Sequence, residues 1–152
     1  MQTDHILVAI DSSGLATEVV QAAGTLAAAL SARVTLLTVV TLPVGVNPFG
    51  MTDGRRNDEI LAEDASNDLE PYVALLERDG VEVTKVLAHG DVPIAILQAV
   101  DEHQPGMVVI GTRGRIGIAK LISGSVAEAV LRVSPVPVLV VRSAAVGLDP
   151  TE

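Results

Sequence analysis

The sequence predicts an α/β fold: a single open, doubly wound sheet of five parallel strands with helices on both faces. Two observations predict it. Short aliphatic runs alternate with segments of helical periodicity along the chain, and strands buried in a parallel sheet read as such continuous runs. The length of 152 residues, 49% of them hydrophobic, is enough for one domain with an aliphatic core.

The predicted strands and helices follow one another in strict alternation. The strands are the aliphatic runs at residues 6–10, 34–40, 81–87, 107–110 and 136–141. The helices show apolar residues at helical spacing, at residues 15–30, 61–76, 94–100 and 125–133. Pro137 cannot donate to a strand ladder, so the last strand is expected at a sheet edge. An aliphatic edge strand needs a cover, and we expect a homodimer that pairs Val136 to Val141 across a two-fold axis.

The domain is expected to span residues 1–143, with a C-terminal tail at residues 144–152. Within the domain, residues 41–57 lack periodicity and are long for a connection, which predicts either a mobile flap or a disordered surface loop. No apolar run approaches bilayer length and the start shows no signal-peptide pattern. We therefore expect a cytoplasmic protein without membrane insertion.

Composition argues against several functions. A net charge of -9 and only two aromatic residues, Phe49 and Tyr72, argue against nucleic-acid binding. Without cysteine the chain has no disulfide, thiolate nucleophile or cysteine zinc site. No Ser-His-Asp set or paired acid and base stands out, so no catalytic residue is predicted. The loop His89-Gly90-Asp91 offers too few ligands for a metal site, and none is predicted. His5 precedes the first predicted strand and is expected at the surface.

The most specific motif is Gly111-x2-Gly114-x9-Gly124-Ser125, which directly follows the fourth predicted strand and leads into the last helix. Glycines let the main chain approach a ligand closely, and the free amides at a helix start point at an anion. Ser125 would aim its hydroxyl and amide at a phosphate, or serve as an ordinary N-cap. The motif predicts a phosphate-binding loop that is not a P-loop, because GxxxxGK[ST] is absent.

The charges around this motif favour the same interpretation. From His103 to Ala127 the chain contains no Asp or Glu, although it is acidic overall. The same stretch contains Arg113, Arg115 and the weaker candidate Lys120. These cations would neutralise phosphates, or they are solvated surface residues. This is the one region of the sequence whose charge favours binding of a polyanion.

Asp11 directly follows the first predicted strand, and ligands of open α/β sheets lie beyond the carboxyl ends of the strands. If the first and fourth strands are neighbours, Asp11 faces the glycine motif. Its carboxylate could then accept hydrogen bonds from a ribose hydroxyl or an adenine amino group, or help to hold a metal ion. The alternative is that Asp11 caps the following helix together with Ser12 or Ser13.

These motifs resemble those of the universal stress protein family over nearly the whole chain. The opening HILVAIDSS is similar to the family's first strand and Asp turn, the glycine motif to its nucleotide motif, and SPVPVLVVR to its terminal strand. The resemblance implies a Rossmann-like fold of the adenine nucleotide alpha hydrolase-like type, with strand order 3-2-1-4-5. It also implies the ATP-binding branch of the family, usually dimerised through the last strands.

The resemblance implies a residue-by-residue assignment of an adenine nucleotide site. Ala9 and Asp11 would line the adenosine end, Val39 would meet the adenine through its backbone, and Ile110 would enclose the nucleoside. The residues that would hold the ribose and phosphates are Gly111, Gly114, Gly124, Ser125 and Val126. The ligand would be ATP, ADP or AMP, with Mg²⁺ or Mn²⁺ carried on the phosphates.

Three functional hypotheses follow. The leading one is an ATP-binding, dimeric regulator of a stress response, whose nucleotide-dependent conformation is read by an unidentified protein partner. The second is a slow ATPase or phosphotransferase that uses a divalent cation. The third is a dimeric scaffold that acts without a nucleotide.

Overall fold

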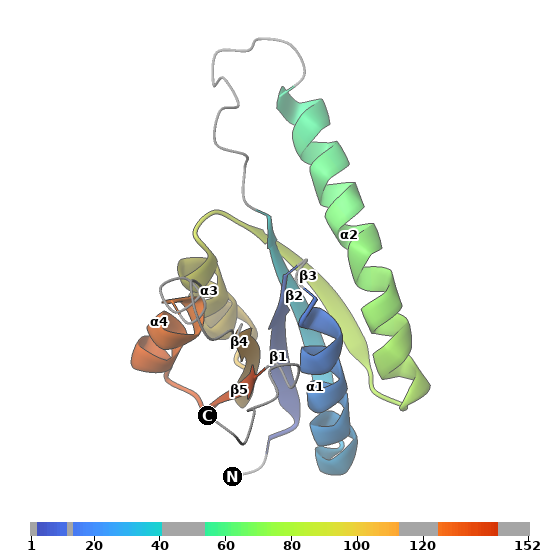
Figure 1. Ribbon diagram of the computed structural model, residues 1–152, viewed down its shortest axis with the longest axis vertical. Helices are drawn as coiled ribbons and strands as arrows, with labels where there is room; N and C mark the ends of the chain where they lie inside the picture. Colours follow the sequence, from blue (N-terminus) through green and yellow to red (C-terminus); the bar gives the residue numbers. More distant parts are fainter. Residues whose placement is uncertain (1–2, 12–13, 41–53, 113–124, 143–152) are drawn as a thin grey trace, which may run out of the picture.

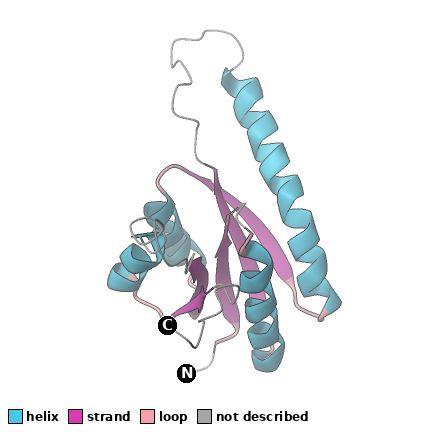
Figure 2. Cartoon of the chain, viewed as in Figure 1, coloured by secondary structure: helices cyan, strands magenta, loops and turns pink. Residues whose placement is uncertain are grey.

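The computed structural model describes residues 3–11, 14–40, 54–112 and 125–142, and it confirms the predicted alternation of strands and helices (Figure 2). The elements in chain order are β1 (His5–Ile10), α1 (Ala16–Leu30), β2 (Arg33–Val40), α2 (Gly54–Arg78), β3 (Val83–His89), α3 (Val92–His103), β4 (Met107–Thr112), α4 (Ser125–Val133) and β5 (Val138–Arg142).

The five strands form one parallel sheet in the order β3-β2-β1-β4-β5, as predicted. The first strand is therefore central, paired with β2 on one side and with β4 on the other. The last strand lies at an edge, as Pro137 indicated. Helices α1 and α2 cover one face of the sheet, and α3 and α4 cover the other (Figure 1).

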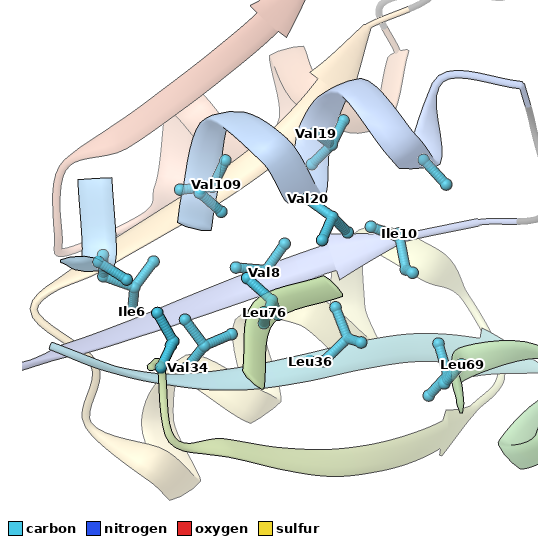
Figure 3. Close-up of a cluster of buried hydrophobic side chains, with 14 of the residues drawn as sticks. Ile6, Val8, Ile10, Val19, Val20, Val34, Leu36, Leu69, Leu76 and Val109 are labelled. Carbon is cyan, nitrogen blue, oxygen red and sulfur yellow. The ribbon is translucent and has the colours of Figure 1, made fainter. Parts of the chain in front are cut away.

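Two hydrophobic cores lie on the two faces of the sheet. Successive side chains of a strand point to opposite faces. In β1, Ile6 and Val8 accordingly pack beneath α1 and α2 (Figure 3), whereas Leu7 packs beneath α3 and α4. All three side chains are fully buried. This two-sided burial explains why β1 reads as a continuous aliphatic run.

Strand β3 begins two residues later than the aliphatic run suggested, at Val83. The cause is the end of α2. Gly80 has a positive φ of 78°, and the N–H of Val81 donates to the carbonyl of Leu76 at 3.2 Å. These features form a helix-terminating turn. The backbone N–H of Val81 caps α2, and the side chain of Val81 is buried in the core.

Strand β5 also begins two residues late, at Val138. The carbonyl of Pro137 accepts a hydrogen bond from the N–H of Val108 at 2.9 Å, but its ring nitrogen has no hydrogen to donate. The ladder therefore starts in full only after the proline.

Helix α2 begins at Gly54, so residues 54–57 of the expected loop are helical. The rest of that loop, residues 41–53, and the tail at residues 144–152 lie outside the described residues. Figure 1 shows the amino-terminal part of α2 extending past the ends of the strands. Among the helices described, none combines the length and the apolar character that crossing a membrane requires.

Candidate functional site

A cavity of about 160 Å³ lies at the carboxyl end of the sheet, above β1 and β4. Its described lining comes from both faces of the sheet and from four strand-to-helix junctions. The lining residues are Ala9, Ile10, Asp11, Leu15, Ala16, Val19, Val39, Val92, Ile96, Ile110, Gly111 and Val126. Asp11 is the charged residue among them, and the others are apolar or glycine.

The strand order explains why the cavity lies there. From β1 the chain crosses over α1 to β2, whereas from β4 it crosses over α4 to β5, in the opposite direction across the sheet. The two connections therefore diverge to opposite faces and leave a crevice between the adjacent ends of β1 and β4. Ligands of doubly wound sheets bind at this kind of reversal point.

The structure brings together six of the residues assigned from the sequence. Ala9, Asp11, Val39, Ile110, Gly111 and Val126 all line this cavity. Ser125 is the first residue of α4, directly beside Val126. Arg113, Gly114, Arg115 and Gly124 lie outside the described residues, so their assignment stays a prediction.

The backbone of Val39 is directed toward the cavity side of β2. In a parallel strand, the N–H and C=O of one residue point to one neighbour and those of the next residue to the other. The N–H of Arg33 donates to Asp4 on the β1 side, whereas Val34 and Val40 bond on the β3 side. Odd-numbered residues of β2 thus face β1. Val39 lies one position beyond the last β1–β2 pair, Ile10 with Thr38, so its carbonyl faces the space above β1.

Gly111 lines the cavity and also has a packing role that was not predicted from the sequence. It lies within β4 rather than after it, because the strand continues to Thr112. A Cβ built on Gly111 would lie 2.7 Å from side-chain atoms of both Leu15 and Val19. The absent side chain therefore allows the first turn of α1 to pack against β4. Close helix packing by itself accounts for glycine at this position.

Asp11 follows β1 directly, as predicted, and its side chain is exposed. Asp11 is not the N-cap residue of α1. The N-cap position of α1 is Leu15, which makes no side-chain cap hydrogen bond. Asp11 lies four residues earlier, at the mouth of the cavity.

Several cavity residues were missed from the sequence. Val92 and Ile96 of α3 and Leu15, Ala16 and Val19 at the start of α1 were interpreted as core or not singled out. Helical periodicity marks a residue as buried, but it does not say whether the residue faces another side chain or a cavity. A usable signal was their position, because each lies within the first turns of a helix that follows a strand.

The electrostatics of the described lining favour a ligand with an apolar part and an anionic part. The aliphatic side chains of α3, β4 and α4 form one wall. Val126 places the first turn of α4 at the cavity, and a helix start carries a partial positive charge. Within the described residues no group of three or more His, Asp or Glu side chains could hold a metal ion. Asp91 instead caps α3, accepting from the N–H of Ile94 at 3.2 Å.

A second hollow of about 500 Å³ lies at the opposite end of the sheet, between the carboxyl ends of α1 and α2. Its lining is polar and includes Asp4, Arg33, Asp79 and Glu82. It is larger than the first, yet it lies at the amino ends of the strands, where parallel sheets do not usually bind ligands. The cavity above β1 and β4 is therefore the candidate site.

Comparison with known sequences identifies related proteins over nearly the full length. A model of the universal stress protein family matches residues 2–142. Universal stress protein YxiE of Bacillus subtilis is 30% identical over 148 residues, which cover 91% of this chain and 99% of that protein.

Comparison with solved structures gives the same result. Protein MJ0577 of Methanocaldococcus jannaschii superposes with a TM-score of 0.78 at 24% identity, covering 94% of this chain and 98% of that one, and so shares the fold. A universal stress protein from Archaeoglobus fulgidus, solved in complex with dAMP, superposes with a TM-score of 0.62 at 26% identity. That match covers 92% of this chain and 98% of the other.

Proposed function

The chain belongs to the universal stress protein family, and we propose that it is a nucleotide-dependent regulator of a stress response that binds ATP or another adenine nucleotide above β1 and β4. The observation that carries the proposal is the cavity at the β1–β4 reversal point, lined by six residues assigned independently from the sequence. The related Archaeoglobus fulgidus protein in complex with dAMP supports the choice of an adenine nucleotide.

The size and lining of the cavity favour the base as the buried part of the ligand. Clefts for drug-sized ligands measure roughly 300–1,000 Å³, whereas this cavity measures about 160 Å³. It can therefore enclose one flat ring system and leave the rest of a nucleotide outside. Aliphatic side chains such as Ile110 and Val126 would cover the faces of the ring by apolar contact, in place of aromatic stacking.

Polar recognition of the base would come from the backbone of β2. The carbonyl of Val39 faces the space above β1, and a carbonyl accepts a hydrogen bond from an exocyclic amino group. Adenine carries such a donor and guanine has a carbonyl at the equivalent ring position. Asp11, exposed at the cavity mouth, would accept from a ribose hydroxyl or from the same amino group.

The phosphates would lie toward α4. The first turn of that helix presents backbone N–H groups and a partial positive charge at the cavity, beside Ser125. In the proposal, Gly114 and Gly124 allow close approach of the main chain, and Arg113 and Arg115 neutralise charge. A divalent cation such as Mg²⁺ or Mn²⁺ would be carried on the phosphates, since the described lining supplies one carboxylate for it.

Regulation would follow from the way the cavity is assembled. Its walls belong to α1 on one face of the sheet and to α3 and α4 on the other. A ligand that contacts all three helices stabilises the arrangement in which they converge. An unidentified protein partner would then recognise that arrangement. This regulatory step and a cytoplasmic location are parts of the proposal.

The experiment is a calorimetric titration of nucleotide-stripped protein with ATP, ADP, AMP and GTP, each with and without Mg²⁺, alongside a long hydrolysis assay. We expect micromolar binding of adenine nucleotides, at least tenfold weaker binding of GTP, and negligible turnover. Turnover of ATP under these conditions would favour the ATPase alternative. Absence of binding by every nucleotide would contradict the proposal and favour the scaffold.

We also propose that the protein is a homodimer through β5. Large aliphatic side chains are exposed along the last helix and strand: Leu139 is 40% exposed, Leu131 52% and Val133 63%. The strand itself lies at the sheet edge, with one side of its ladder facing outward. Pairing of two such edges would cover both the backbone groups and the aliphatic side chains.

Substitution of Leu139 by Glu tests this dimer, because it places a charge in the proposed interface. We expect the wild type to sediment as a dimer and the Leu139→Glu protein as a monomer at the same concentration. Ile94→Glu is the matched control, since Ile94 is a similarly exposed aliphatic residue on α3, outside β5. A Leu139→Glu protein that sediments like the wild type would exclude β5 as the interface.

A further inference from the structure

His5 is buried at the amino end of the sheet, contrary to the expectation that it lies at the surface. It is the first residue of β1 and only 4% exposed. Its ring atom Nε2 lies 2.7 Å from the hydroxyl oxygen of Thr35 on β2. Its other ring nitrogen, Nδ1, is also buried and has no hydrogen-bond partner among the described residues.

His5 lies where β1, β2 and the segment that follows α3 meet. Its backbone carbonyl accepts from the N–H of Gly106, in the segment between α3 and β4, at 2.9 Å. Its side chain projects to the face that α3 and α4 cover, because it alternates with Ile6 and shares a face with Leu7. His103, the last residue of α3, is close enough to act on its charge state.

The surroundings of His5 disfavour the positively charged form of its imidazole. Burial lowers the pKa of His5 below its ordinary value of 6.5, and so do Arg33 on β2 and His103 on α3. Asp4 beside it and the backbone of His103 act in the opposite direction and do not reverse the shift. Asp101 and Glu102, on the same turn of α3 as His103, are exposed. The segment from Gln104 to Met107 carries no charge.

We propose that His5 is an acid-sensitive latch, which in its neutral form holds the carboxyl-terminal end of α3 against β1 and β2 and in its protonated form releases it. Protonation of His5 would add a positive charge that Arg33 and His103 both disfavour, with Asp4 acting in the opposite direction. The same strand and helix carry Ala9, Val92 and Ile96 at their other ends, in the cavity wall. Release at the amino end would therefore loosen elements that also form the candidate site.

The sign of the pH dependence follows from linkage. The folded-state pKa of His5 lies below that of the unfolded chain, so the unfolded chain takes up the proton first as the pH falls. Above the unfolded-state pKa of about 6.5, protonation of His5 does not reduce the free energy of unfolding. The free energy of unfolding then decreases as the pH falls from that value toward the folded-state pKa. Over this range the ratio of folded to unfolded protein falls by up to about tenfold per pH unit.

The experiment measures urea unfolding of the full chain between pH 8 and pH 5 for the wild type, His5→Gln and His89→Gln. Glutamine can still bond to Thr35 but does not titrate. We expect the wild type to lose stability below about pH 6.5 more steeply than His5→Gln. His89→Gln should follow the wild type, because His89 is exposed at the other end of the sheet. Equal pH slopes for the wild type and His5→Gln would overturn the proposal.

A second measurement applies even if His5→Gln does not fold. The imidazole signals of the wild type are followed by NMR, with His89→Gln and His103→Gln assigning the remaining signal to His5. We expect that signal to titrate below about pH 6.5, and the protection of the Gly106 amide, relative to its intrinsic exchange rate at each pH, to fall over the same range. In His103→Gln the midpoint should rise, because one positive neighbour is removed. Titration of His5 at or above its ordinary value, or an unchanged protection factor at Gly106, would contradict the latch.

Discussion

At the carboxyl end of the sheet, β1 and β4 border a cavity, whereas at the amino end β1 is closed by a buried histidine and the segment that follows α3. The two ends lie on the same strands, and β1 is only six residues long. The carboxyl end has apolar walls and a backbone carbonyl directed toward the cavity. The amino end uses a polar side chain whose partner, Thr35, is supplied by the neighbouring strand.

The difference follows from chain direction in a parallel sheet. All strands end at the same edge, and there the connections diverge to opposite faces where the strand order reverses. At the other edge the chain returns from the helices and enters the strands through tight segments. The amide of Gly106 there bonds to His5, and that of Arg33 bonds to Asp4. The carboxyl end is thus suited to a ligand and the amino end to a fixed contact.

The largest effect is expected from Gly111→Val, at the carboxyl end. A Cβ at this position would lie 2.7 Å from Leu15 and Val19, so the new side chain must displace the start of α1. We expect a loss of about 3 kcal/mol in the free energy of unfolding, the upper end of the usual cost of overpacking. Gly14→Ala is the control, because nothing lies within 4 Å of a Cβ there. Equal urea midpoints for the two variants would show that α1 does not depend on a glycine at position 111.

A smaller effect is expected from Thr35→Val, at the amino end. The substitution keeps the shape of the side chain but leaves Nε2 of the buried His5 without its partner. We expect a loss of about 2 kcal/mol, within the 1–3 kcal/mol typical of an unsatisfied buried polar group. Thr38→Val, on the same strand near the carboxyl end, is the matched control, because Thr38 is only half-buried. The prediction fails if the two valine variants unfold at the same urea concentration.

The smallest effect on stability, but a selective effect on binding, is expected from Val126→Phe. Val126 lines the cavity and is only partly buried, so the larger ring should fill the space proposed for the base. We expect adenine nucleotide affinity to fall at least tenfold, or about 1.4 kcal/mol, with little change in the urea midpoint. Ile94→Phe, at an exposed position of α3 outside the cavity lining, should bind like the wild type. Calorimetry that finds equal affinity in both variants would exclude this cavity as the base site.

Much of the fold was predictable because its signals are local. Aliphatic runs located the strands, and Pro137 placed the last of them at an edge. The exact ends were not predictable. Val81 is as apolar as the strand residues that follow it, but its amide is used to close α2. Nothing local distinguishes a buried residue that caps a helix from one that starts a strand.

The site was predictable to a lesser extent, because its geometry depends on distant elements. Asp11 was assigned from its position after a strand and Val126 from the family resemblance, and both line the cavity. The packing role of Gly111 was not, because Leu15 and Val19 lie far from it in sequence. The burial of His5 was missed for the same reason. A histidine ahead of a strand is expected at the surface, and its partner Thr35 lies thirty residues later in the sequence.

The proposed difference in function between the two ends can be measured by residue-resolved NMR of the labelled protein titrated with ATP at pH 7.5. We expect large shift changes at Ala9, Asp11, Val39, Ile110 and Val126. We expect none beyond baseline at His5, Thr35 and Gly106. Shift changes confined to the amino end, or no change anywhere at saturating ATP, would contradict the proposed difference.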